Sequence, residues 1–265
     1  MDQGQSSQRR RRRSKKEPKP QFNLGKYFTV PTFLHEEVGR KRLLPLFILF
    51  IAFIGIVNAF RFGGASLDYY SVKNSISLWI NKGTAQSQTS YESAKASINT
   101  ANVLHHSNPL YLELDAQIKE WGVLSGFEAD MGLQAAQASY LLASKSRPLW
   151  PVTWANLAML KWRKQEFDDE MLSYLNRAHT LGLQKAEVHI LFTQLGLSLY
   201  QANHPFYRSI REQTQTHIKK GIQANPSRNQ IVAFIKDNGH HRTVCRWLDV
   251  NADEFAISML GCQKA

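Results

Sequence analysis

Residues 146–160 read SRPLWPVTWANLAML, and this stretch decides the fold class. Pro148 and Pro151 stand three residues apart, and a proline is tolerated in the first turn of a helix but not in its interior. Trp154 and Leu157 follow at a spacing of three, which places both side chains on one helix face. The stretch therefore predicts one helix that ends before Pro148 and a second that begins at Pro151.

The residues before Pro148 have a spacing that resembles the tetratricopeptide repeat, a helix pair that recurs about every 34 residues. Ala136, Tyr140 and Ala143 place a small, a large and a small side chain at offsets of 0, 4 and 7, and the proline comes at offset 12. Small side chains let two helices approach closely, while the large one fills the groove between them. Trp154, six residues after the proline, takes the aromatic position that opens the next repeat.

Weaker copies of this pattern occur on both sides. Large apolar residues recur 34 residues after Trp154 and Leu157. Parts of the small–large–small pattern also occur earlier and later in the chain. The positions that carry these copies are Ala94, Ile98, Ala101, Leu175, Ala178, Val188, Leu191, Ile218 and Pro226. We therefore predict an all-α fold in which residues 63–265 form a tetratricopeptide-like helical-repeat domain. An irregular helical bundle is the alternative.

Residues 43–60, LLPLFILFIAFIGIVNAF, form an apolar segment with no charge and one polar side chain, that of Asn58. At ~1.5 Å per residue a helix of this length spans roughly 27 Å, close to the ~30 Å hydrocarbon core of a bilayer. We predict a single transmembrane helix over residues 43–62. The alternatives are a buried helix of a soluble protein, which rarely lacks a polar face at this length, and a cleaved signal peptide, which begins near the N-terminus.

Much of the formal net charge of +12 lies before this segment, where residues 1–42 hold twelve of the 33 Lys and Arg residues. Those residues show no apolar periodicity, so we expect a disordered tail. Basic residues gather on the cytoplasmic side of a membrane helix. The charge pattern therefore predicts a cytoplasmic N-terminus, a bacterial inner-membrane location and a periplasmic domain over residues 63–265. It does not predict nucleic-acid binding, because the basic residues do not line a folded face.

Cys245 and Cys262 both lie in the predicted outer domain. An oxidising compartment permits a disulfide between them, and such a bridge stabilises by about 3 kcal/mol in the chain-entropy model. We predict this bridge. Two unpaired buried thiols are the alternative.

The nine histidines form no metal-binding pattern such as HExxH, and no CxxC accompanies them. The isolated histidines are His179, His189, His204 and His217. We expect them at the surface or at helix ends, because their positions in the sequence suggest no cluster. The sequence predicts no metal site and no bound cofactor.

One dense acidic cluster comprises Glu166, Asp168, Asp169 and Glu170. It falls at the expected turn between two helices, where Asp is a natural cap and acids complement the positive end of the following helix. A catalytic carboxylate pair needs an enclosing cleft that separates the two pKa values, and the sequence indicates none. We predict no catalytic residue.

Polar and aromatic residues off the buried faces supply a candidate binding surface. It comprises Arg147, Trp150, Asn156, Lys161 and Gln165. The remaining aromatic candidates for an exposed position are Trp79, Trp162 and Tyr207. Trp79 lies close to the predicted membrane helix, where a tryptophan often anchors at the bilayer surface.

The stretch that begins SRPLWPVTWANLA resembles the RPxWPxxWxxLA motif of the VpsP family. The matching residues are Arg147, Pro148, Trp150, Pro151, Trp154, Leu157 and Ala158. Members of this family are single-span inner-membrane proteins associated with exopolysaccharide and biofilm biosynthesis. The resemblance implies a role in assembly or export of an extracellular polysaccharide and assigns no catalytic residue.

These observations together predict a membrane-anchored, non-enzymatic periplasmic adaptor that acts through protein–protein contacts. The expected partners are other membrane proteins of polysaccharide synthesis or export, with membrane lipid contacted through the anchor. Three alternatives remain: a general envelope-assembly adaptor, a module that binds the nascent polysaccharide, and an enzyme that modifies a glycan.

Overall fold

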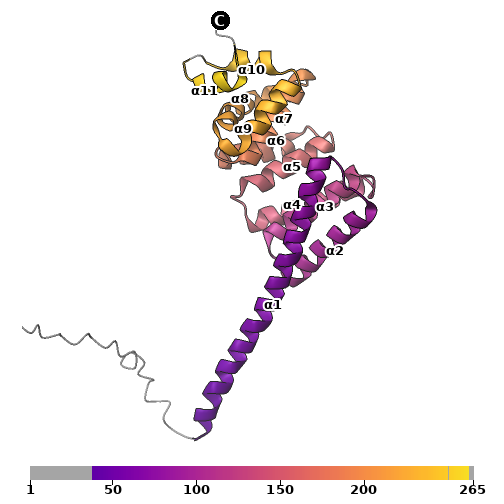
Figure 1. Ribbon diagram of the computed structural model, residues 1–265, viewed down its shortest axis with the longest axis vertical. Helices are drawn as coiled ribbons and strands as arrows, with labels where there is room; N and C mark the ends of the chain where they lie inside the picture. The colour runs from indigo at the N-terminus through magenta and orange to yellow at the C-terminus, as the bar shows by residue number, and fades with distance from the viewer. Residues whose placement is uncertain (1–37, 250, 263–265) are drawn as a thin grey trace, which may run out of the picture. The chain divides into compact units, whose positions relative to one another are not determined.

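The computed structural model describes residues 38–249 and 251–262, and the regular structure within these ranges is entirely helical (Figure 1). The helices are α1 (Val38–Lys82), α2 (Gln88–Leu104), α3 (Pro109–Leu124), α4 (Met131–Ser146), α5 (Pro151–Arg163), α6 (Asp169–Leu181), α7 (Ala186–Gln201), α8 (Tyr207–Gln223), α9 (Asn225–Asp237), α10 (His241–Trp247) and α11 (Glu254–Leu260). The all-α prediction is confirmed. Of the predicted tail, residues 1–42, residues 1–37 lie outside the described residues, and residues 38–42 belong to α1.

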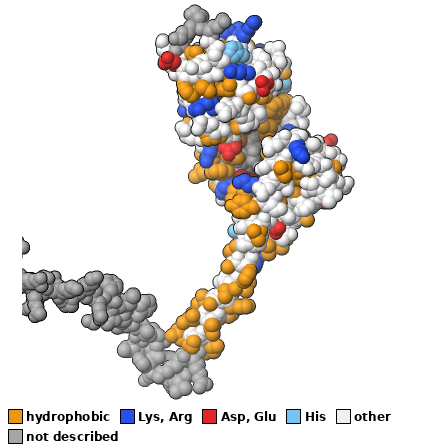
Figure 2. Space-filling model, in the orientation of Figure 1, with side chains coloured by type: hydrophobic (Ala, Val, Ile, Leu, Met, Phe, Trp, Pro, Cys, Tyr) orange, Lys and Arg blue, Asp and Glu red, His pale blue; other side chains and the backbone are white. Residues whose placement is uncertain are grey.

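Helix α1 has 45 residues, begins before the predicted membrane segment and continues to Lys82. The chain divides into two compact units, residues 1–56 and 57–265. In the first unit the large apolar side chains of α1 from Leu43 onward are exposed, and Figure 2 shows them covering this part of the helix. The helix over Leu43–Lys82 is long and apolar enough to cross a membrane.

The second unit begins with the later part of α1, which has one buried face. Ala65, Val72, Ile76 and Trp79 recur at helical spacing on this face and are packed with side chains of α2 and α3. The Trp79 ring is 1% exposed and lies edge-to-face with Trp121, with ring centroids 6.1 Å apart. The expectation that Trp79 lies at a surface was wrong, because it lies on the buried face of the helix.

The following helices form successive pairs, each joined by a short turn. Helices α3 and α4, α5 and α6, and α7 and α8 pack most closely, and neighbouring pairs contact each other through α4 with α5 and α5 with α7. The small–large–small positions are buried at these contacts: Ala136, Tyr140 and Ala143 are at most 1% exposed. Stacked pairs of this kind are the tetratricopeptide-like arrangement that the spacing predicts.

The predicted boundaries around the opening stretch are also confirmed. Helix α4 ends at Ser146, before Pro148, and α5 begins with Pro151 at its first position. Trp154 is 7% exposed and Leu157 is fully buried, and the indole N–H of Trp154 donates to the Pro148 carbonyl at 2.8 Å. This hydrogen bond fixes the turn against the first helix of the next pair.

Helices α7 and α8 approach closely at Gly196. A Cβ atom at this position would lie 2.3 Å from the side chain of Thr214, so only glycine fits without a shift. Helices α9, α10 and α11 then form a third hydrophobic cluster with the end of α8, around Ile218, Ile231 and Val244. These last helices cover the end of the stacked pairs, as a helical array requires for solubility.

Candidate interaction surface

The turn between α4 and α5 presents Arg147 and Trp150. Trp150 is half-buried, with the Arg147 guanidinium 4.9 Å and the Lys185 amine 4.3 Å from its ring centroid. Cations over an aromatic face are attracted by the ring quadrupole. Arg147 also forms an ion pair with Glu113 of α3 at 3.1 Å. The turn is therefore tied to the preceding pair and to the α6–α7 turn.

Glu113 is buried between α3 and α5, and it accepts a hydrogen bond from the Thr153 hydroxyl. Burial raises the pKa of the Glu113 carboxyl, while Thr153 and Arg147 act in the opposite direction by stabilising the charged form. Both partners lie beyond α4 in the chain. The carboxylate thus links α3 to the start of the next helix pair.

Glu120 lies about two helical turns after Glu113 on α3 and is 4% exposed. The Tyr140 hydroxyl donates to it at 2.5 Å, and Arg163 of α5 forms an ion pair with it. Burial raises the pKa of Glu120 and that of Tyr140. Glu113 and Glu120 are therefore each bound by one hydroxyl and one guanidinium.

Asn156 is half-buried and lines a groove of about 250 Å³ beside the Glu120 cluster. A second hollow of about 230 Å³ adjoins it, and the two share Ile76, Ile80 and Gln117. The groove follows α1 and α3 toward α5, and α3 and α5 are the first helices of successive pairs. Ile80 is 63% exposed at its edge.

Lys161 does not belong to an exposed surface, contrary to the prediction. Its side chain is 5% exposed, and its amine lies 2.8 Å from Glu166, 2.6 Å from Asp168 and 2.8 Å from Glu170. Burial alone lowers the pKa of this amine, but hydrogen bonds to the three carboxylates outweigh burial and raise it. Lys161 is the buried counter-ion of the acidic turn.

The acidic cluster has the capping role that the sequence predicts. Asp168 is the N-cap of α6, and its carboxylate accepts from the Met171 backbone N–H at 2.9 Å. Gln165 lies at the same turn, is exposed and has a positive φ of 59°. Its amide donates to the Trp162 carbonyl at 2.9 Å, so it closes the turn after α5.

Three histidines expected to be scattered come together between α6, α7 and α8, and this expectation was wrong. The Nδ1 atom of His217 lies 2.8 Å from His189 Nδ1, and its Nε2 atom lies 3.0 Å from His179 Nδ1. His217 is fully buried and His189 is 1% exposed. Burial lowers the pKa of His189 to about 4 and that of His217 to about 3, and the positive charge of Lys220 adds to both shifts.

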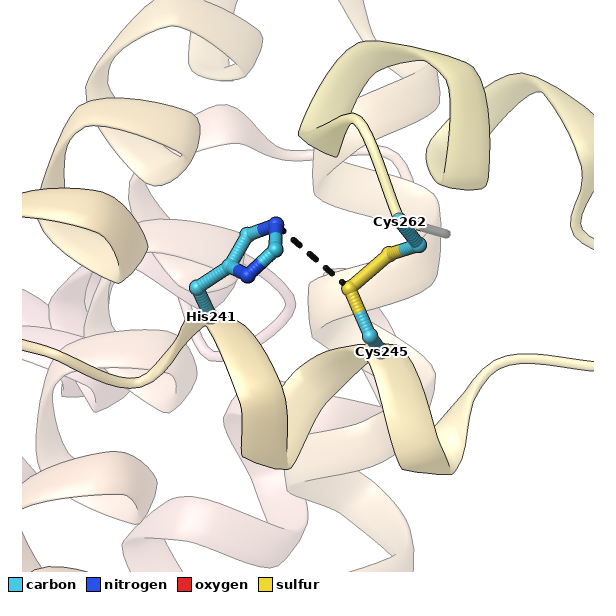
Figure 3. Close-up of side chains that lie close together, drawn as sticks. All are labelled: His241, Cys245 and Cys262. Carbon is cyan, nitrogen blue, oxygen red and sulfur yellow. Dashed lines mark hydrogen bonds between the residues drawn. A yellow bond between two sulfur atoms is a disulfide. The ribbon is translucent and has the colours of Figure 1, made fainter. Parts of the chain in front are cut away.

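The predicted disulfide is present between Cys245 of α10 and Cys262 near the chain end, with Cα atoms 5.7 Å apart (Figure 3). His241 lies one helical turn before Cys245, with Nε2 3.6 Å from the Cys245 sulfur and 3.1 Å from the Leu260 carbonyl oxygen. Three potential metal ligands are thus adjacent. Metal binding by cysteine requires thiolates, which the disulfide withholds.

No protein-family model matches this sequence, and no curated protein matches it. A solved structure of pilF from Pseudomonas aeruginosa is similar, with a TM-score of 0.45 and 14% sequence identity over 76% of this chain and 80% of that chain. No functional conclusion follows from a similarity at this level. The helix pairs described above define the class: an all-α protein of tetratricopeptide-like architecture.

Proposed function

We propose that the protein is a membrane-anchored, non-enzymatic adaptor in extracellular polysaccharide synthesis or export. In this proposal residues 43–62 span the bacterial inner membrane, residues 1–42 are cytoplasmic and residues 63–265 are periplasmic. The exposed apolar side chains at the start of α1 support the anchor, and the cluster of basic residues before them supports the orientation. The disulfide fits an oxidising compartment.

The groove along α1, α3 and α5 is the observation that carries the adaptor role. Its wall combines exposed apolar atoms, such as those of Ile80, with polar side chains such as Gln117 and Asn156. Arrays of helix pairs commonly offer such a face to a peptide or helix of a partner. The adjoining acid Glu120 is already bonded to Tyr140 and Arg163, so it is a structural group rather than an available proton donor.

The polysaccharide pathway is supported by the resemblance to the VpsP motif around Arg147 and Trp150. In the structure these two residues lie in contact at the turn between two helix pairs. The proposed partners are membrane proteins that polymerise or export the polysaccharide. A general envelope-assembly adaptor would share the fold and the groove but would not affect the polymer.

The test is an in-frame deletion, complemented with the wild type or with groove variants. We expect the deletion to abolish secreted polysaccharide and the wild type to restore it. Gln117→Arg with Asn156→Arg fills the groove with charge and is expected to reduce both secreted polymer and cross-linking to the membrane proteins that polymerise or export it. Gln134→Arg with Asn99→Arg, at exposed helix positions that do not line the groove, is the matched control. Normal polymer in the deletion strain would exclude the pathway, and normal cross-linking by the groove variant would exclude the groove.

A further inference from the structure

A separate hollow, of about 550 Å³, lies between the α7–α8 turn and α10 and shares no residue with the groove described above. Three aromatic residues line it: Tyr200 of α7, Tyr207 of α8 and Trp247 of α10. The Tyr207 and Trp247 rings are nearly parallel, at 19°, with centroids 6.4 Å apart. Tyr200 stands edge-on to both, at 66° and 85°. The three rings therefore contact one another and form one aromatic cluster in the wall of the hollow.

The same hollow is lined by two cationic side chains, Arg208 and Arg211, both on exposed positions of α8. Within the described residues neither guanidinium takes part in an ion pair, whereas Arg147 and Arg163 each do. The described residues that line the hollow include no acidic side chain. An arginine offers a planar set of donors that matches a carboxylate. The charge of the site therefore favours an anionic ligand.

We propose that this hollow binds a carboxylate-bearing sugar residue of an acidic saccharide. The apolar C–H face of the sugar ring packs on the aromatic rings, and the two guanidinium groups bind its carboxylate. Asn203 and His204, which complete the edge of the hollow, offer an amide and an imidazole to the ring hydroxyls. The volume falls in the range of small-molecule sites, about 300–1,000 Å³.

Other ligand classes fit these residues less well. An aromatic cluster alone suits an organic cation, but the two arginines repel one. A purely apolar ligand leaves both guanidinium groups without a counter-ion. A sugar acid matches both features at once, because its ring has an apolar face, a rim of hydroxyls and one carboxylate.

The site is also fixed before a ligand arrives. Trp247 follows Cys245 by two residues on the short helix α10, and the bridge to Cys262 ties that helix to the chain end (Figure 3).

The Tyr207 hydroxyl is buried and makes no hydrogen bond within the described chain. A buried hydroxyl without a partner costs about 1–3 kcal/mol, so a ligand oxygen or water that reached it would be stabilising.

The test is isothermal titration calorimetry of the full chain in detergent with a galacturonate trisaccharide, against a neutral glucose trisaccharide. We expect the acidic sugar to bind at least about tenfold more tightly. Arg208→Gln with Arg211→Gln and, separately, Trp247→Ala should each weaken its binding about tenfold. Arg246→Gln, an exposed arginine next to Trp247 that does not line this hollow, is the control and should change affinity little.

Several results would overturn the proposal. These are equal binding of the neutral sugar, no binding of the acidic sugar at millimolar concentration, or an Arg208→Gln, Arg211→Gln variant that binds as the wild type does. The arginine variants are at exposed positions, so they test the site even if Trp247→Ala fails to fold. Tighter binding of a peptide through its C-terminal carboxylate would instead assign the hollow to a protein partner. The adaptor proposal concerns a different groove and is judged by different variants.

Discussion

Lowering the pH from about 7.5 to about 5.0 is expected to destabilise the α7–α8 pair through its buried histidines. Burial lowers the pKa of His189 to about 4 and that of His217 to about 3, so both stay neutral in the folded chain at pH 5. In the unfolded chain a histidine has a pKa of about 6.5 and is protonated at that pH. The unfolded state therefore binds more protons, and stability falls as the pH falls.

The magnitude follows from the difference between the two states. Between pH 7.5 and pH 5 each of these two histidines lowers the free energy of unfolding by about 2 kcal/mol, so the two together lower it by about 4 kcal/mol. The loss begins near pH 6.5 and is complete only near the folded-state pKa values, about 3 to 4. The neighbouring charges have opposite effects, since Lys220 lowers and Glu187 raises the pKa of His189.

Hydrogen exchange of the α7 and α8 backbone amides in the full chain measures this change directly, after correction for the intrinsic effect of pH. The double variant His189→Gln, His217→Gln should be less stable at pH 7.5 but should lose most of the pH dependence. His106→Gln, at an exposed position, should keep it. Equal protection of the wild type at both pH values, or an unchanged slope in the double variant, would refute the reasoning.

Three further changes test other parts of the domain by thermal and urea unfolding. Lys161→Met leaves the three carboxylates of the α5–α6 turn without their buried counter-ion, and it should cost about 2 kcal/mol, less than for fully buried pairs because the acids are partly exposed. Gly196→Ala forces a Cβ into the α7–α8 contact and should cost about 1–3 kcal/mol, whereas Gly63→Ala, with no atom within 4 Å, should not destabilise. The double change Cys245→Ser, Cys262→Ser should cost about 3 kcal/mol. Stabilities equal to the wild type would contradict each expectation.

The helical architecture was predictable because it depends on local spacing. Tyr140 and Leu157 are buried where the offsets place them, since a side chain's face on a helix follows from its position alone. The ends of α4 and α5 were predictable from Pro148 and Pro151 for the same reason. The pairing of the two cysteines was predictable because they are the two cysteines of the chain.

The polar interior was not predictable, because it depends on which helices meet. Lys161 was assigned to the surface by its charge, yet acids from the following turn enclose its amine. His189 and His217 are 28 residues apart and meet only because α7 packs on α8. One feature of the sequence did point to burial of His217: it directly precedes Ile218, which the repeat register places in the interior and which is buried. The contact between His189 and His217 could not be predicted, because the two residues are far apart in the sequence and histidine has a polar side chain.

The polar links of α3 also make the helix pairs non-interchangeable. Glu113 is bonded to Thr153, and Glu120 to Arg163, both in the helix pair that follows. Excising α5 and α6 to shorten the array would remove the Thr153 hydroxyl from Glu113 and the Arg163 guanidinium from Glu120. Glu120 would then lose the cation of its buried ion pair, at a cost of several kcal/mol. Insertion or deletion of a whole helix pair is therefore disfavoured at this junction. The order of the helix pairs is therefore favoured by two side chains of α5, Thr153 and Arg163, which bind the acids of α3.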